Sequence, residues 1–270
     1  MKGFGSGAMP ATRIEQWKGI LREHFFEVAV ASIYTFLFFL PCLFWIIWVA
    51  FSGLFVEDSI YNYLVIYGGI CLGITLAGLG FAGGFYFFRK LLWNEGANVH
   101  LDFFKGIRKN GKDFAKIFFL LGLAYFALHV SSSFLNQMEK GWLPAALLGV
   151  EYVFFFLLLM ISVFCMVEAT IYQGSLAMFF KNGCKFLVGN ILPNLGLFFL
   201  LFLPFLLFEF VPNMTVRFVA ILCYFPFYSG LFELSYFAYC LSLFDPYIHR
   251  TKYPEIYRKG LTNEDENHYK

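Results

Sequence analysis

The stretch that decides the fold is residues 28–56, VAVASIYTFLFFLPCLFWIIWVAFSGLFV, which contains no Asp, Glu, Lys or Arg. Residues 60–88 form a second run without charge. A helix needs about 20 predominantly apolar residues to cross the hydrocarbon core of a bilayer, and both runs exceed that length. A membrane barrel would instead need alternating strands of about ten residues. Because backbone groups in lipid must pair within a helix or a closed barrel, the two runs predict transmembrane helices.

The composition of the whole chain agrees with this interpretation. Of its 270 residues, 60% are hydrophobic and only 14% are charged, whereas soluble domains carry about 25% charged residues. We therefore expect an all-α polytopic membrane bundle at 28–243, with an amphipathic cytoplasmic lead-in at 1–27 and a cytoplasmic tail at 244–270. The six predicted spans are 28–55, 61–88, 115–135, 143–169, 186–208 and 217–243.

The distribution of Lys and Arg predicts how the spans are oriented. Eighteen of the 20 basic residues lie in the lead-in, the second and fourth connections and the tail. The other two, Lys140 and Arg217, lie in the third and fifth connections. Cytoplasmic loops carry the excess of Lys and Arg, so both termini are predicted to be cytoplasmic in a plasma membrane protein.

A basic, aromatic phrase occurs twice, as FFKGIRKNGKDF at 103–114 and as FFKNGCKF at 179–186. Each copy precedes an apolar run, so spans two and three and spans four and five would form related hairpins. Such internal repeats are common in membrane proteins that gate a central site. The chain also has 39 Phe residues, which makes an FF pair common by chance. An internal repeat and a coincidence both stay open.

The basic residues around these phrases are predicted to anchor the chain to lipid headgroups or to dock a partner. Apolar residues recur at helical spacing in 99–108, which indicates a short amphipathic helix on the inner leaflet. The Asn110-Gly111 pair is expected to turn the chain into the membrane. Residues 13–27 have a similar amphipathic pattern. The candidate lipid-binding or partner-binding residues are Lys105, Arg108, Lys109, Lys112, Lys181 and Lys185.

Three segments carry a resemblance to a known family. They are FLFFLPCLFWIIW at 36–48, YFFRKLLWNEGANVHLDFFKGIRKNGKDF at 86–114 and SLAMFFKNGCKFLVGNILPNL at 175–195. In these motifs and their order the chain resembles the YesL-like family of bacterial integral membrane proteins, a domain of unknown function, over nearly its whole length. The family usually has an Asn ahead of the proline of span one, and this chain has none there. The resemblance implies a bacterial plasma membrane protein, often encoded beside carbohydrate uptake systems, and implies no catalytic residues.

Ionisable residues inside the spans are the candidates for a polar site. Glu233 lies near the middle of span six, where a charge costs about 2.5–3.5 kcal/mol on insertion scales. Glu151 lies in the outer half of span four, and His129 lies at a similar depth in span three, so a contact between them is geometrically feasible. Polar side chains inside a membrane can also serve only to hold helices together through hydrogen bonds. A structural role and a ligand-binding or proton-carrying role are both open for all three residues.

Span two contains two GxxxG spacings, which predict close helix packing within the chain or in a dimer. The glycines are Gly69, Gly73, Gly80 and Gly84.

Enzyme signatures such as HExxH, GxSxG and the P-loop do not occur in the sequence, and no motif predicts a metal, a cofactor or nucleic acid. We therefore expect a non-enzymatic accessory or regulatory partner of a membrane transport system, such as one for carbohydrate uptake. Its expected partners are membrane lipids and a transporter permease. The alternative is a small transporter with a polar site around Glu151, His129 and Glu233.

Overall fold

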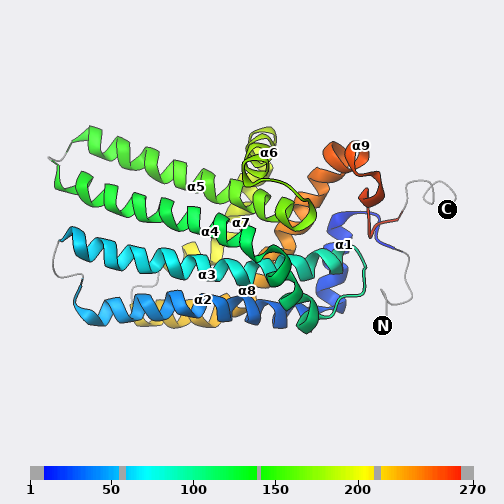
Figure 1. Cartoon of the computed structure of the whole chain (residues 1–270), viewed down its shortest axis with the longest axis horizontal. Helices are drawn as coiled ribbons and strands as arrows, with labels where there is room; N and C mark the ends of the chain where they lie inside the picture. The colour runs from blue at the N-terminus through cyan, green and yellow to red at the C-terminus, as the bar shows by residue number, and fades with distance from the viewer. Residues whose placement is uncertain (1–8, 55–58, 139–140, 210–213, 263–270) are drawn as a thin grey trace.

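The computed structural model is a bundle of long helices (Figure 1). It describes residues 9–54, 59–138, 141–209 and 214–262, and within these ranges there is no strand. The helices are α1 (Arg13–Glu23), α2 (Phe25–Ser52), α3 (Ile60–Leu92), α4 (Val99–Gln137), α5 (Trp142–Ile171), α6 (Leu176–Gly189), α7 (Ile191–Glu209), α8 (Met214–Phe244) and α9 (Arg250–Lys252). A π-helical turn at Asp245–His249 joins α8 to α9, and a 3₁₀ turn follows at Pro254–Ile256.

Four helices, α2 to α5, are each long and apolar enough to cross a membrane. Figure 1 shows them side by side and alternating in direction along the long axis of the molecule. The pair α6 and α7 is a fifth candidate, although the two helices are bent by 96° at the break between them. The helix α8 is not one of these candidates, and it packs against α2 and α3. The prediction of an all-α bundle is confirmed for the described residues, and four or five of its helices are long and apolar enough to span a membrane. The six spans and their topology stay a prediction.

Glycines on α3 allow its neighbours to approach closely. Gly69, Gly73 and Gly80 face α2, and Gly84 faces α8. A Cβ added at Gly73 would lie 2.7 Å from Cys42 Cα, a separation too short for two carbon atoms that are not bonded. The four glycines of the GxxxG spacings therefore pack inside the chain, as expected where small residues bring helix backbones together.

The core of the bundle lies toward the end that carries α1. The ends of α3, α5 and α8 meet there with the starts of α4 and α6, and phenylalanines from these five helices are fully buried. Its fully buried members include Phe85, Phe87, Phe88, Phe103, Phe114, Phe164, Phe179, Phe237 and Phe244. At the opposite end, large apolar side chains such as Trp142 and Phe51 are exposed, which is the pattern expected of surface that faces lipid.

Two expectations for residues 99–111 were wrong. The helix α4 runs without interruption from Val99 to Gln137, so no separate surface helix precedes it and no turn occurs at Asn110-Gly111. Asn110 is buried, and a Cβ added at Gly111 would lie 3.2 Å from the side chain of Leu79 on α3. Packing against α3 thus outweighs the local preference of Asn-Gly for a turn. The second copy of the phrase also lies within a helix, α6.

The predicted span 186–208 is divided at Asn190 rather than continuous. The backbone N–H and the side-chain amide of Asn190 both donate to Phe186 O, at 3.2 and 3.3 Å. The amide of Asn194 donates to Phe186 O at 3.2 Å and to Leu187 O at 3.3 Å. Pro193 has no N–H to continue α6, but its fixed φ suits the first turn of α7. The amides of Asn190 and Asn194 therefore end α6, and Pro193 favours the start of α7.

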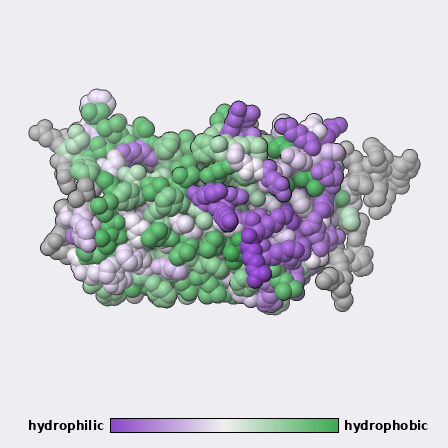
Figure 2. Space-filling view, in the orientation of Figure 1, coloured by the Kyte–Doolittle hydropathy of each residue, from purple (hydrophilic) through white to green (hydrophobic). Residues whose placement is uncertain are grey.

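The two ends of the described chain meet at one end of the bundle. Thr262 N donates to Pro10 O at 3.1 Å, and α1 packs against α8, α2 and α3. We call α1 together with residues 245–261 the cap. Figure 2 shows hydrophilic side chains gathered on the part of the molecule that carries the cap, whereas the surface toward the other end is largely hydrophobic. The predicted amphipathic lead-in thus docks on the bundle.

Candidate functional site

Glu233 is fully buried where α8 packs against α2 and α3. Its Oε1 accepts a hydrogen bond from Thr35 Oγ1 at 2.9 Å, while its Oε2 has no hydrogen-bond partner. The carboxyl group occupies the space that a Cβ at Gly84 would need. Ser32 and Ser229 add a second polar contact between α2 and α8, with their hydroxyl oxygens 2.9 Å apart. This arrangement is a polar helix–helix contact of the kind that joins membrane helices.

Glu151 and His129 are close in the fold but have different partners. Glu151 is half-buried and accepts a hydrogen bond from Ser131 Oγ on α4. The ring of His129 stacks on Tyr67, with centroids 4.7 Å apart and planes 11° apart. It also meets the Tyr125 ring edge-on, with centroids 4.3 Å apart. Ser131, rather than His129, is therefore the hydrogen-bonding partner that the structure gives to Glu151.

The three intramembrane candidates do not form one site. His129 lies level with Tyr67 on α3, whereas Glu233 lies level with Gly84 on the same helix. These two levels are 84 − 67 = 17 residues apart. At about 1.5 Å of rise per residue, that separation is about 25 Å along the helix axis. A single polar site around Glu151, His129 and Glu233 is thus absent from the bundle, and the candidates divide into two separate contacts.

The six predicted basic residues all have exposed side chains. Four of them follow the spacing i, i+3, i+4 and i+7 at the start of α4, so they form one stripe on that helix. We call Lys105, Arg108, Lys109 and Lys112 the basic stripe. Lys181 and Lys185 are one turn apart on α6. The phrase that occurs twice therefore places Lys at the surface of two helices, while its glycines face the interior.

A buried polar network in the cap was not predicted from the sequence. Arg13 forms a salt bridge with Asp245, with Nη2 and Oδ2 2.9 Å apart. The other carboxylate oxygen of Asp245 lies 2.8 Å from Nδ1 of His249. Nε2 of His249 lies 2.6 Å from the hydroxyl oxygen of Tyr172, at the end of α5. We call these four side chains the cap network, and it joins α1, α5 and the segment after α8.

The cap network holds the Asp245 carboxyl in its charged form. Burial by itself would raise the pKa of this group. The hydrogen bond with His249 and the charge and hydrogen bonds of Arg13 outweigh burial, so the pKa of Asp245 lies below its ordinary value. Arg13 is itself held by further bonds, to Gln16 Oε1 at 2.8 Å and to Lys259 O at 3.0 Å. A buried charge pair of this kind is stable because each partner is hydrogen-bonded on several sides.

One signal in the sequence could have pointed to this network. The stretch DPYIH at 245–249 places an acid and a histidine four residues apart, directly after an apolar run. Such spacing puts both side chains on the same side of a helical turn. Arg13 and Tyr172 could not have been found in this way, because only the fold brings them to Asp245 and His249.

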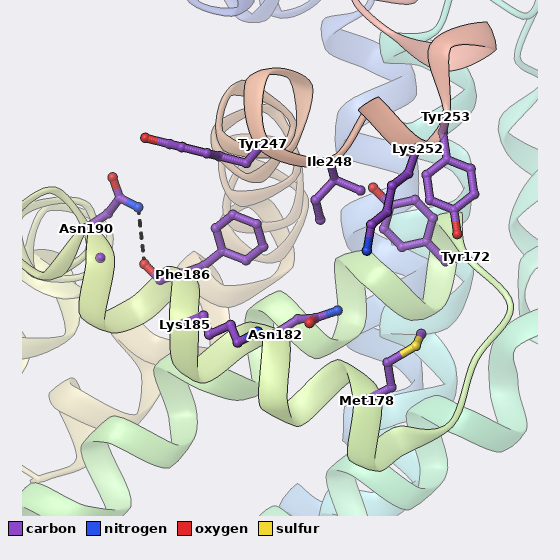
Figure 3. Close-up of a pocket in the computed structure, with 11 residues that line it drawn as sticks. Tyr172, Met178, Asn182, Lys185, Phe186, Asn190, Tyr247, Ile248, Lys252 and Tyr253 are labelled. Atoms are coloured by element: carbon purple, nitrogen blue, oxygen red, sulfur yellow. Dashed lines mark hydrogen bonds between the residues drawn. The ribbon is translucent and has the colours of Figure 1, made fainter. Parts of the chain in front are cut away.

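A cavity of about 460 Å³ lies beside the cap network, between α6 and the segment after α8 (Figure 3). Most of the described lining residues are polar or aromatic, and they include two Lys but no Asp or Glu. The lining residues are Tyr172, Met178, Asn182, Lys185, Phe186, Gly189, Asn190, Tyr247, Ile248, Lys252 and Tyr253. Figure 3 shows Lys252 reaching from the C-terminal segment toward Asn182 on α6. We call this space the α6 cavity.

A larger cavity of about 1040 Å³ lies on the other side of the cap network, among α1, α7 and α8. Leu197, Leu200, Leu201, Pro204 and Leu231 are among the residues that make its walls mainly apolar. Arg13, Asp245 and Arg258 lie at its polar end. Neither large cavity is lined by Glu151, His129 or Glu233. The cap network thus separates a cationic cavity from an apolar one.

Within the described ranges, no group of three or more His, Cys, Asp or Glu side chains could hold a metal ion. A hydroxyl, an imidazole and a carboxylate do follow one another in the cap network, as they do in a nucleophilic triad. Here, however, the carboxylate is already paired with Arg13. The cap network therefore has the geometry of a structural link that holds α1, the end of α5 and the segment after α8 together.

Comparisons of the chain with family models, with curated proteins and with solved structures found no match. The resemblance to the YesL-like family therefore rests only on the three quoted segments and stays an expectation.

Proposed function

We propose that this chain is a multipass protein of a bacterial plasma membrane that acts without catalysis, as an accessory or regulatory partner of a membrane transport system. The cap is the observation that carries this proposal. It is a folded unit, tied together by buried hydrogen bonds, on the part of the molecule where the hydrophilic surface gathers. The cap also binds the connection before α4, where Lys259 of the cap pairs with Glu95, and so it fixes the start of α4, which carries the basic stripe.

The proposed topology has six crossings and cytoplasmic termini. Thr262 N donates a hydrogen bond to Pro10 O, which supports a topology with both ends of the described chain on the same side of the membrane. An even number of membrane crossings places both ends of a chain on the same side. The helices α2 to α5, the bent pair α6 and α7 as one crossing, and α8 give six. The bias of Lys and Arg toward the predicted cytoplasmic segments supports the same orientation.

The proposed contact with the partner is the basic stripe of α4. Its residues are exposed, and the apolar side chains of Leu101 and Phe104 are exposed on the same turns, at 73% and 50%. Among described ion pairs, none involves Lys105, Arg108 or Lys109. Basic groups without an ion-pair partner among the described residues are available to acidic groups of a partner or to anionic lipid.

The test is purification from the native membrane in mild detergent, followed by mass spectrometry. We expect a permease in stoichiometric amount with the unchanged protein, and at least fivefold less with Lys105→Ala, Arg108→Ala and Lys109→Ala combined. The matched control combines Lys18→Ala, Arg22→Ala and Arg250→Ala, three exposed basic residues of the cap. A lone monomer or homodimer contradicts the proposal. Equal loss of the permease in both variants contradicts the role of the stripe.

One observation favours a small transporter as a second candidate. Glu233 and Glu151 each keep one carboxylate oxygen without a hydrogen-bond partner inside the bundle. The test is proton flux in sealed vesicles that contain a pH-sensitive dye. A transporter would lose flux at least tenfold in Glu233→Gln while its unfolding temperature stays the same. Vesicles with no flux above empty controls, for the unchanged protein and the variant alike, would rule out proton transport.

A further inference from the structure

We propose that the α6 cavity binds a phosphate ester that also carries hydroxyl groups, either the headgroup of an anionic phospholipid or a small soluble phosphate. A volume of about 460 Å³ lies within the range of about 300–1,000 Å³ that is typical of small-molecule sites. This inference is independent of the transport partner proposed above, because the cavity is on α6 and the C-terminal segment rather than on the basic stripe.

The charge of the lining specifies an anion. Lys185 and Lys252 both line the cavity, and neither forms an ion pair with a described residue. No described residue of the lining carries a carboxylate, so no described group in the lining neutralises these two ammonium groups. Lys is a point charge with three donors and is a common ligand of phosphate oxygens. Two such groups from different elements converge on one space (Figure 3).

The polar groups of the lining add acceptors for hydroxyl groups. Asn182 donates its amide N–H to Glu168 Oε2 at 2.9 Å, which fixes the orientation of that amide. Asn190 donates to Phe186 O at 3.3 Å, and Figure 3 shows its amide oxygen turned away from that bond. Side-chain carbonyl oxygens that remain free accept hydrogen bonds from ligand hydroxyls.

The aromatic side chains form walls around the charged groups. Tyr253 stacks on Tyr172 with ring centroids 5.0 Å apart, and Phe186 and Tyr247 lie on the opposite side in Figure 3. The ring of Tyr247 is 67% exposed, so a ligand in the cavity can reach it. A few placed polar groups among aromatic walls are typical of a site that orients a small ligand. Tyr172 belongs both to these walls and to the cap network, so an occupied cavity would contact the network directly.

The experiment uses the full chain in detergent at about 0.15 M salt, where distant surface charges are screened. Binding of glycerol 3-phosphate is measured by calorimetry, and retention of phosphatidylglycerol against phosphatidylcholine is measured by native mass spectrometry. The test variant is Lys185→Gln with Lys252→Gln. The control is Lys18→Gln with Arg22→Gln, which removes the same charge from exposed positions outside the cavity and outside the basic stripe. Unfolding temperatures show that both variants remain folded.

We expect the test variant to bind at least tenfold more weakly and the control to change by less than twofold. Dependence on Lys185 and Lys252 with glycerol 3-phosphate supports a soluble ligand. The same dependence with phosphatidylglycerol alone supports a lipid headgroup. The proposal is overturned if neither probe depends on these two lysines, or if the control loses binding to the same extent.

Discussion

The most constrained residues of this bundle are a carboxyl group and the glycine it packs against. Glu233 and Gly84 are far apart in the sequence, but the carboxyl group fills the space that any side chain at position 84 would need. Position 84 cannot gain a side chain while Glu233 is kept, because interiors packed this closely do not absorb an extra methyl group without strain.

Gly84→Ala is therefore expected to destabilise the protein by about 1–3 kcal/mol, the usual cost of overpacking. Gly68→Ala is the matched control on the same helix, because a Cβ there has no neighbour within 4 Å. Thermal unfolding in detergent measures both. Combining Gly84→Ala with Glu233→Ala should recover part of the loss, since the clash disappears. Equal unfolding temperatures for the two glycine variants would show that the close contact has no energetic effect.

The charge pair of the cap predicts a dependence of stability on pH. The pKa of Asp245 is lower in the folded protein than in the unfolded chain, so this carboxylate stabilises the fold at neutral pH. That stabilisation begins to decline as the pH falls past the unfolded pKa, and it is lost as the pH falls through the lower folded pKa. Asp245→Asn should cost about 3 kcal/mol at pH 7, because it leaves Arg13 buried without its partner.

Unfolding temperatures of Asp245→Asn and the unchanged protein, measured from pH 7 down to pH 3, test this prediction. The gap between the two should narrow as the medium becomes acidic. Asp113→Asn is the control, since its salt bridge with Lys116 is exposed and contributes little. A gap that stays constant over the whole range would mean that the charge of Asp245 does not matter.

At the scale of the element, the bend between α6 and α7 depends on two asparagines. The amides of Asn190 and Asn194 bond the carbonyls that end α6. Carbonyl groups at the end of a helix need such partners, particularly away from water. The 96° bend is therefore built from side-chain hydrogen bonds as well as from Pro193.

Asn194→Leu removes two of these bonds and should cost about 1–3 kcal/mol, the penalty for buried polar groups that lose their partners. Leu192→Ala is the control, because Leu192 is 77% exposed on the same turn. Spin labels at Lys181→Cys and Leu200→Cys would report the angle between the helices. We expect a broader and longer distance distribution in Asn194→Leu, and an unchanged distribution would refute a role of Asn194 in the bend.

Some elements were predictable from the sequence and others were not. The charge-free runs predict the ends of α2 and α3 to within about four residues. They can do so because the position and length of the apolar run determine where a membrane helix begins and ends. The continuity of α4 through Asn110-Gly111 was missed, since it depends on packing against α3. The cap network was missed for a similar reason: the bond between Arg13 and Asp245 joins positions 232 residues apart.

At the scale of the whole molecule, the basic end and the apolar bundle predict which positions share one side of the membrane. Lys18 and Lys181 belong to the end that carries the cap, and Trp142 begins α5 at the opposite end. We expect cysteines at positions 18 and 181 to react with a membrane-impermeant maleimide only after the cells are opened, and a cysteine at position 142 to react in intact cells. Reaction of all three on one side would contradict the proposed topology. The native protein, with its own six cysteines, serves as the background control.

The salt bridge between Arg13 and Asp245 also sets an order of events during synthesis. Arg13 leaves the ribosome 232 positions ahead of its partner, and at about 5–20 residues per second that interval lasts roughly 10–50 s. Throughout it, α1 lacks the carboxylate that neutralises its arginine. The first helix to be made is thus among the last to reach its final place. A chain released before Asp245 would carry an unpaired arginine, which would distinguish unfinished copies from finished ones for quality-control proteases.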